Sequence, residues 1–517
     1  MPDKSNPLSK IRHVVVVMLE NRSFDNLLGW LYDPANPAPF NVVPPNFEGL
    51  SGKNFSNRAP DGRVISVGKT EDPHSPQPNP GEPFEDVYSQ IYNVDKLPFN
   101  QIPPVPPQPP NMQGFIRNYA VQKDKPADPA TIMQCLTPKT IPVLSALAHN
   151  YALCDHWFSS IPTQTFCNRS FVHAGTSSGY VNNAGGRHVF INDTTTIFDL
   201  LEDAHKNLTW NIFCGSWLLE SFTLLTQKHL WKYALTPHFA HFNDFLAAAA
   251  RPGGLPNYSF IEPVYFDSVI WGAHNDMHPE SNLYEFYGPS NLHKGEALLW
   301  KIYNAVRNSP DWDSTLLVIL FDEHGGCYDH VPPPSAPDCT VAIAPDKNII
   351  PPTQPGGAGF KFDRLGPRVP AIIISPYTPP QTRLNAIFEH TSILKTVVNC
   401  FDLPQDQLGD RTTAALDLSS ALTEPAARTD QPAIPKPDSS LLADLEAETH
   451  AIVHSRLLGA QQKPLSDLQK NALHAAALLT NSADLANRID TLETELQADL
   501  MLVEHEAKFV KNKIFPA

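Results

Sequence analysis

The chain has few cysteines, no long apolar run and a shortage of positive charge. Its seven cysteines among 517 residues are scattered and lack a paired C-x-x-C spacing, which argues against a disulfide scaffold or a structural zinc site. No stretch approaches the roughly 20 apolar residues that a membrane-spanning helix requires. Lys and Arg total 38 against 54 Asp and Glu, for a formal charge of -16, so we expect no nucleic-acid partner and no transmembrane segment.

From the amino-terminal sequence we expect no cleavable signal peptide. An apolar run that reads as the first strand begins within the first fifteen residues, before any leader of normal length could end. Together with the unpaired cysteines, this predicts a cytoplasmic protein. Secretion by a route without a cleavable signal, or a sequence trimmed at its start, would give the same pattern.

Proline, by contrast, is abundant, and its 52 residues are clustered. The clusters lie at 34–45, 73–83, 98–110 and 351–355. Proline lacks a backbone donor and disfavours a helix before it, so these stretches predict extended surface excursions around a core. The chain is long enough for one large α/β domain with insertions.

Two apolar runs, 14–19 and 316–321, lead directly into oxygen-bearing side chains. Uninterrupted Val, Ile and Leu indicate strands covered on both faces, and ligands of open parallel sheets gather at the carboxyl ends of such strands. The side chains that the two strands would bring together are those of Glu20, Asn21, Asp322 and Glu323. Hard oxygen donors of this kind suit one divalent ion, and Mg, Ca, Mn or Fe would all fit.

Each half of this candidate metal site also has a plainer interpretation. The pair Glu20 and Asn21 could cap the helix that Ser23 and Asp25 suggest. The acidic doublet at 322–323 could form a solvated turn before two glycines. Two adjacent acids at the end of a buried strand, however, need a cation to offset their repulsion, and together the two segments favour the metal.

Strand-like and helical segments alternate along the chain. Strands are expected at 209–214, 258–262 and 370–375, and helices at 196–205, 295–308 and 390–401. This βα alternation predicts an α/β fold with a mostly parallel central sheet and helices on both faces.

The composition changes towards the carboxyl terminus. We expect a catalytic domain over 1–423 with a Pro-rich insertion at about 34–135, a linker at 424–440 and a helical extension at 441–517. One helix face of the extension would carry Leu485, Ile489, Leu492, Leu496, Leu500 and Val503. Such a face predicts either a hairpin packed on the core or a coiled-coil contact that forms a homo-oligomer.

A Pro-interrupted loop at 159–169 supplies candidate nucleophiles. It carries hydroxyl groups, which a metal can ionise, and the thiol of Cys167. An isolated cysteine is more often a small buried apolar residue. Candidate proton donors or phosphate contacts are His278, His324, His330 and His390.

Several motifs in fixed order resemble the bacterial phosphoesterase family. These motifs are 20–25, Asn168 with Arg169, 275–279, 322–333, 368–370 and 390–394, and they span roughly residues 10 to 405. The family includes phosphatidylcholine-type phospholipases C and a broad-specificity acid phosphatase, and it is related in fold to alkaline phosphatase. The resemblance therefore implies an alkaline phosphatase-like catalytic domain.

The resemblance also implies residue roles. Glu20, Asn21, Asp322 and Glu323 match the family's metal ligands, and the loop that ends in Asn168-Arg169 puts Thr165 at the position of the nucleophile, with Thr163 as the alternative. His278 matches an active-site histidine of the family. Relatives often carry a histidine after Pro80-Gly81, where this chain has Glu82; His74 is a possible substitute.

The function implied is metal-dependent hydrolysis of phosphoric diesters such as choline phospholipids, through a covalent phosphothreonine. Thr165 would attack, Asn168 would neutralise the phosphoryl oxygens with help from His324 and His330, and His278 or His390 would protonate the leaving group. Aromatic residues available for a choline cage are Trp157, Tyr180, Trp217, Tyr258 and Trp271. Alternatives are an acid phosphatase that acts on monoesters, a catalytically inactive binding or assembly protein, and a thiol hydrolase that uses Cys167.

Overall fold

A computed structural model provides the fold. It describes residues 6–265, 274–279, 291–334 and 360–447, with short gaps at 124, 186–187, 205–206, 217, 431, 433 and 445–446. It also describes residues 467–489, 492, 501 and 505–506.

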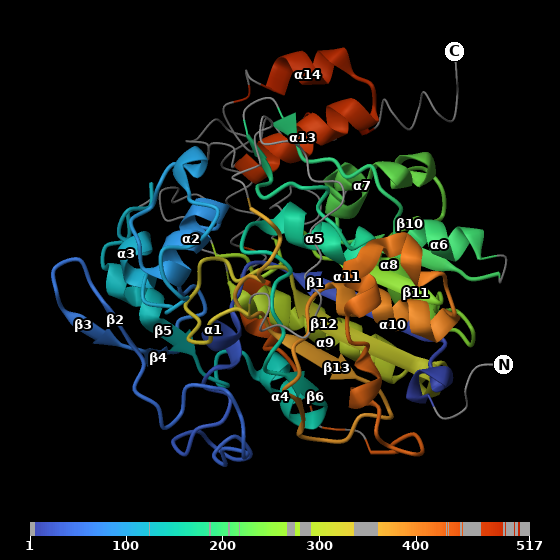
Figure 1. The fold of residues 1–517 in the computed structure, drawn as a ribbon. Helices are drawn as coiled ribbons and strands as arrows, with labels where there is room; N and C mark the ends of the chain where they lie inside the picture. The colour runs from blue at the N-terminus through green and yellow to red at the C-terminus, as the bar shows by residue number, and fades with distance from the viewer. Residues whose placement is uncertain are drawn as a thin grey trace.

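An eight-stranded sheet forms the centre of the molecule, in the order β10-β9-β11-β1-β12-β13-β6-β14 (Figure 1). The strands are β1 (His13–Leu19), β6 (Ala152–Cys154), β9 (Trp210–Cys214), β10 (Phe239–His241), β11 (Tyr258–Glu262), β12 (Thr315–Phe321), β13 (Ala371–Ile374) and β14 (Thr382–Leu384). Every neighbouring pair is parallel except the two that involve β13, which runs against β12 and β6. The mostly parallel sheet is confirmed.

The central strands are buried on both faces, as their uninterrupted apolar sequences predict. In β1, every residue from Val14 to Leu19 is at most 1% exposed, and β12 is buried along its whole length. Both faces of the sheet must therefore be covered by helices. The strands expected at 209–214, 258–262 and 370–375 are found as β9, β11 and β13.

Helices lie on both faces. One layer contains α4 (Pro142–Asn150), α8 (Phe242–Ala249) and α9 (Leu292–Arg307), and the other contains α5 (Thr165–Ala174), α6 (Ile197–Asp203), α7 (Phe222–Thr226), α10 (Thr391–Phe401) and α11 (Gly409–Ala414) (Figure 1). The helices expected at 196–205, 295–308 and 390–401 are α6, α9 and α10. None of the described helices combines the length and the apolar character needed to cross a membrane.

The Pro-rich insertion packs beside the sheet around its own apolar cluster. It contains α2 (Phe84–Tyr92), α3 (Phe115–Tyr119), the hairpin of β2 (Ser56–Arg58) and β3 (Val64–Ser66), and β4 (Gly68–Thr70), which pairs with β5 (Gln134–Leu136). A further short hairpin, β7 (Ala184–Gly185) with β8 (His188–Val189), lies outside the insertion. The helix α1 (Phe24–Leu28) joins β1 to the insertion.

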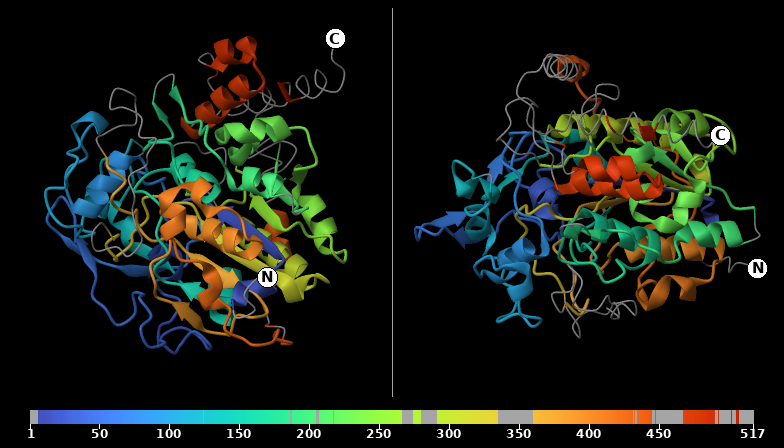
Figure 2. Two further views of the ribbon diagram at one scale, coloured as in Figure 1. Left: turned by 45° about the vertical axis from the view of Figure 1, so that its right-hand side comes forward. Right: turned by 90° about the horizontal axis from the view of Figure 1, so that it is seen from above.

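The carboxyl-terminal helices α13 (Asp467–Leu479) and α14 (Ala483–Ile489) pack on each other, and α13 packs on α7 (Figures 1 and 2). Leu485 and Ile489 are buried in one apolar cluster with Leu219 and Leu225. Of the expected apolar face, Leu492 packs partly buried against this cluster, whereas Leu496, Leu500 and Val503 lie outside the described residues. The first part of the expected linker runs along the catalytic domain, where Glu424 N donates to Tyr377 O at 2.9 Å and Arg428 N to Pro376 O at 2.8 Å.

Candidate active site

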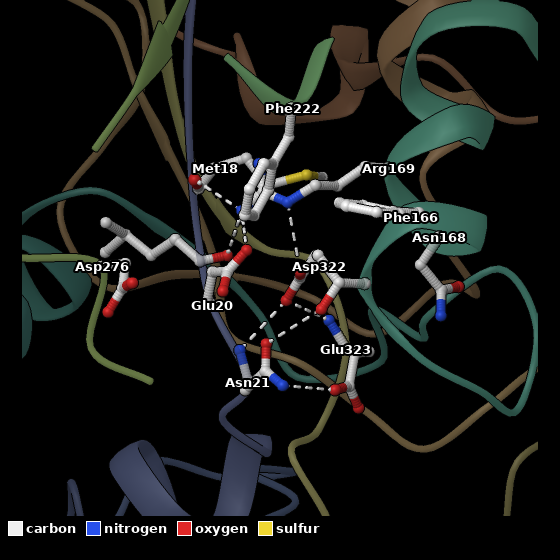
Figure 3. Close-up of polar contacts among 12 residues, drawn as sticks. Met18, Glu20, Asn21, Phe166, Asn168, Arg169, Phe222, Asp276, Asp322 and Glu323 are labelled. Carbon is white, nitrogen blue, oxygen red and sulfur yellow. Dashed lines mark hydrogen bonds and ion pairs between the residues drawn. The ribbon is translucent and has the colours of Figure 1, made fainter. Parts of the chain in front are cut away.

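The register of β1 and β12 places the two acidic segments side by side. Leu19 pairs with Phe321, so Glu20 and Asp322 leave the same edge of the sheet at the next position (Figure 3). Both side chains are at most 1% exposed. Acids that are far apart in the sequence are therefore neighbours in space.

Asn21 links the two strand ends directly. Its backbone N–H donates to Asp322 Oδ1 at 3.0 Å, and its Nδ2 donates to Glu323 Oε1 at 2.7 Å. Asn21 has a positive φ of 58°, a conformation that asparagine tolerates better than most residues and that turns the chain sharply after β1. The predicted convergence of Glu20, Asn21, Asp322 and Glu323 is present.

Thr165 completes this group. It is the first residue of α5 and is 1% exposed, and its Oγ1 donates to Asn21 Oδ1 at 3.5 Å. Its position at a helix N-terminus gives the hydroxyl a neighbourhood of positive partial charge, which favours an anion. Thr163, the alternative nucleophile, instead donates its hydroxyl to Val181 O at 2.5 Å.

Asn168 holds the loop at 159–169 in shape. Its Nδ2 donates to Thr163 O at 2.7 Å and to Ile161 O at 3.2 Å, and its Oδ1 accepts from Ile161 N at 3.0 Å. Figure 3 shows Asn168 apart from the network of acids. Both the amide nitrogen and the amide oxygen of Asn168 are bonded within the loop, so its contact with a phosphoryl group stays a prediction.

Arg169 is a buried cation between the acids. Its Nε lies 3.2 Å from Asp322 Oδ2, and its Nη2 lies 3.2 Å from Glu20 Oε1. Beyond the Asn-Arg motif, nothing in the sequence indicates that Arg169 contacts these two acids. The arginine neutralises part of the negative charge that the strand ends bring together.

The acids remain undercompensated. Burial raises the pKa of Glu20 well above its usual value, opposed by Arg169 and reinforced by Asp322. Burial raises the pKa of Glu323 in the same way, and the charges of Glu82 and Asp322 add to it. Burial also raises the pKa of Asp322, against Arg169. A carboxylate that stays charged in this setting needs a further cation, so the hard-oxygen donor set fits a divalent metal.

One buried oxygen points to the same conclusion. Glu20 Oε1 accepts no hydrogen bond of good geometry from the described residues, although Arg169 lies nearby. Buried polar atoms without a hydrogen-bond partner are rare in folded proteins and often indicate an absent ion or water. The residues that could hold a divalent ion here are Glu20, Asn21, Thr165, Asp322 and Glu323.

His278 forms an ion pair with Glu82 beside this group. Its Nε2 lies 3.3 Å from Glu82 Oε1. Burial alone would lower the pKa of His278, but the carboxylates of Glu82, Glu20 and Asp276 together raise it to about 10. Glu82 therefore lies beside the site. His74 lies near His293 instead: burial lowers the pKa of His293, and the charge of His74 lowers it further.

His390 and His324 are buried with both ring nitrogens close to polar groups. His390 Nε2 donates to the backbone oxygen of Asp322 at 2.6 Å, and its Nδ1 accepts from Trp157 Nε1 at 3.3 Å. His324 lies 2.8 Å from Gln90 Oε1 through Nε2 and 3.2 Å from Glu323 Oε2 through Nδ1. Burial lowers the pKa of His390 to about 4 and that of His324 to about 3, so both rings are neutral near pH 7.

His330 belongs to a second group of titratable side chains. Its Nδ1 lies 2.6 Å from Asp25 Oδ2, and with Asp329 the three residues offer ligand atoms within 4.8 Å of one another. Arg368, however, lies 2.9 Å from both Asp25 Oδ1 and Asp329 Oδ1. Here one guanidinium faces two carboxylates, whereas at the strand ends the guanidinium of Arg169 serves a group of three, those of Glu20, Asp322 and Glu323.

The remaining candidates lie in the core or outside the described residues. Cys167 is fully buried, and burial raises the pKa of its thiol well above the usual value, which does not favour a thiolate nucleophile. Trp157 stacks on Phe388 inside the core, with ring centroids 5.7 Å apart, and Tyr258 is buried in β11. Trp217 and Trp271 lie outside the described residues.

Comparison with known proteins assigns the family. The model of the Phosphoesterase family matches residues 11–404. Non-specific phospholipase C3 from Arabidopsis thaliana is 32% identical over 97% of this chain and 88% of its own length. Phospholipase C A from Mycobacterium tuberculosis (strain ATCC 25618 / H37Rv) is 27% identical over 79% of this chain and 77% of its own length.

A solved structure also matches. A protein in the alkaline phosphatase superfamily from Vibrio parahaemolyticus matches with a TM-score of 0.31 and 11% identity, covering 62% of this chain and 81% of that chain. The chain belongs to the phosphoesterase family and is a hydrolase of phosphoric esters.

Gly325 provides a test of the site's geometry. A Cβ at Gly325 would lie 1.9 Å from the carbonyl oxygen of Asn21, whereas at Gly253, which shares a φ of +63°, it would meet nothing within 4 Å. We expect Gly253→Ala to lose about 1–2 kcal/mol of stability from the backbone conformation alone. Gly325→Ala should lose about 1–3 kcal/mol more through overpacking, and should also bind divalent ions more weakly.

Urea unfolding and titration of the metal-stripped protein with Mn²⁺ measure both effects. Equal stability losses and equal Mn²⁺ affinities in the two variants would contradict the contact between Gly325 and Asn21.

Proposed function

We propose that the protein is a metal-dependent, phospholipase C-like phosphodiesterase that works through a covalent phosphothreonine. The observation that carries this proposal is the convergence of an acid-amide pair, an acidic doublet and a threonine hydroxyl at one edge of the sheet. Membership of the phosphoesterase family and the names of the phospholipase C relatives support it. The names of these relatives support a phospholipid substrate, and choline phospholipids are the class that the sequence resemblance implies.

Thr165 is the nucleophile of the proposal. Its Oγ1 attacks phosphorus, the bond from phosphorus to the leaving alcohol breaks, and water later hydrolyses the phosphothreonine and frees the hydroxyl. Two features support this choice over Thr163: the approach of Oγ1 to Asn21 and the position at the N-terminus of α5. The hydroxyl of Thr163 is engaged with Val181.

Glu20, Asn21, Thr165, Asp322 and Glu323 would hold one divalent ion. When bound, such an ion supplies Lewis-acid chemistry, which lowers the pKa of a coordinated hydroxyl and stabilises charge on phosphoryl oxygens. Arg169 and the backbone N–H of Asn21 keep the acids oriented. The identity of the ion, whether Mg, Ca, Mn or Fe, is left to elemental analysis.

His278 is the proton donor that we propose for the leaving alcohol. Its raised pKa keeps the ring protonated near neutral pH, and the Glu82 carboxylate orients Nε2. His390 is less suited, because its Nε2 proton is already bound to the Asp322 carbonyl and its pKa is low. We therefore assign His390 to positioning Asp322.

Glu82 favours a diester over a monoester substrate. A monoester near neutral pH carries about two negative charges and a diester carries one, so the acids of the site, which include Glu82 and outnumber the cations Arg169 and His278, repel the monoester more strongly. This supports the phospholipase C-like activity over the alternative, a broad-specificity acid phosphatase. The buried and undercompensated acids Glu20 and Glu323 argue against an inactive binding protein, because an inactive protein would gain nothing from keeping such a costly cluster.

Replacement of Thr165 tests the nucleophile. Thr165→Ala should reduce turnover of p-nitrophenylphosphorylcholine by at least about 10³-fold, because the proposed covalent intermediate forms on Thr165. Thr165→Ser should keep measurable activity. Thr163→Val, which removes the alternative hydroxyl at similar shape, should stay within about tenfold of the parent. Undiminished turnover by Thr165→Ala, or by protein stripped of metal with a chelator, would end the proposal.

Replacement of Glu82 tests the choice of substrate. Glu82→Gln should raise the ratio of p-nitrophenyl phosphate to p-nitrophenylphosphorylcholine turnover by about tenfold, because it removes one repelling charge. Glu85→Gln removes the same charge three residues away and should leave the ratio unchanged. An unaltered ratio in Glu82→Gln, measured as kcat/KM for both substrates, would show that Glu82 has no part in selection.

A further inference from the structure

All three nitrogens of the Arg169 guanidinium contact oxygen atoms of the protein. Besides its ion pairs with Glu20 and Asp322, Nη2 donates to Met18 O at 3.1 Å and to Leu19 O at 3.2 Å, and Nη1 donates to Tyr265 Oη at 2.8 Å. The side chain is 2% exposed. One guanidinium thus joins the end of β1, the acid of β1 and the acid of β12 (Figure 3).

This contact pattern makes the spacing of the acids depend on the orientation of Arg169. A guanidinium is planar and presents its donors in a rigid fork, so a rotation that improves one ion pair weakens the other. Glu20 and Asp322 are both in the set that would hold the divalent ion. Whatever fixes the plane of Arg169 therefore also fixes the separation of two ligands.

Tyr265 fixes that plane. Its hydroxyl accepts from Nη1 of Arg169 and donates to Glu262 Oε1 at 3.3 Å. Its ring stacks on Phe222 at 3.7 Å with an interplanar angle of 8°, and the guanidinium carbon of Arg169 lies 5.0 Å from the Tyr265 ring. The aromatic pair leaves the hydroxyl little freedom to follow a moving arginine.

Glu262 anchors the hydroxyl in turn. Its Oε1 accepts from Thr223 N at 2.9 Å and from Thr223 Oγ1 at 3.0 Å, and its Oε2 accepts from Ser221 Oγ at 2.5 Å. These donors belong to α7 and its N-cap, and Glu262 is the last residue of β11, the strand beside β1. The order Glu262, Tyr265, Arg169 therefore connects α7 to the candidate metal ligands by direct hydrogen bonds.

We propose that Tyr265 is a positioning residue of the divalent-ion site. It holds Arg169 in the orientation that sets Glu20 and Asp322 at the spacing the ion requires. Glu262 and α7 provide its rigid support. This inference rests on the proposed function, because it assumes that the strand-end acids bind the ion.

The test removes a single hydroxyl group. Tyr265→Phe keeps the stacking on Phe222 but removes the acceptor for Nη1 of Arg169. Tyr258→Phe is the matched control, because the buried hydroxyl of Tyr258 has no hydrogen-bond partner among the described residues. The readout is the affinity of the metal-stripped full chain for Mn²⁺, measured by isothermal titration calorimetry, with thermal unfolding of each metal-free variant measured alongside.

We expect Tyr265→Phe to bind Mn²⁺ about 10- to 100-fold more weakly, with the stoichiometry kept at one ion, and Tyr258→Phe to bind like the parent. Arg169→Lys, which keeps the charge but lacks the fork, should weaken binding at least as much as Tyr265→Phe. Parental affinity in a folded Tyr265→Phe variant would overturn the inference. Failure of the parent itself to bind one equivalent of Mn²⁺ would instead contradict the proposed function.

Discussion

The repulsion between acids at the ends of two adjacent parallel strands is the constraint on which the rest of the site depends. The register of β1 and β12 fixes Glu20 and Asp322 as neighbours, and burial removes the water that would otherwise screen them. Arg169 compensates part of this charge. The undercompensated remainder is the physical reason to expect a divalent ion.

The surrounding structure keeps these charges in place. Asn21 turns the chain after β1 in a left-handed conformation, and Gly325 provides the space for its carbonyl group. A hydrogen bond to Tyr265, which Glu262 holds in place, orients Arg169 from the neighbouring strand. The helix α7 supplies donors for Glu262, and the carboxyl-terminal helix α13 packs on α7. The family model ends at residue 404, yet the helices beyond it pack on an element that supports the site.

The strands and the acids at their ends could be predicted from the sequence, because an uninterrupted apolar run that leads into oxygen donors is typical of a buried strand ending at a ligand site. The direction of β13 could not, because an apolar run reads alike in a parallel and an antiparallel neighbour. The motif order led to Thr165, but the contacts of Asn168, His330 and His390 depend on the folded chain. Tyr265 was missed for the same reason: nothing near it in the sequence indicates a partner at Arg169.

Anomalous X-ray diffraction from crystals of the full chain grown with Mn²⁺ would locate the bound ion. We expect one strong peak within coordination distance of Glu20, Asn21 and Asp322, beside the hydroxyl of Thr165. The structure also contains a competing group, Asp25, Asp329 and His330, whose ligand atoms lie within 4.8 Å of one another. A peak at that group alone, or no peak at Mn²⁺ concentrations that saturate activity, would contradict the account.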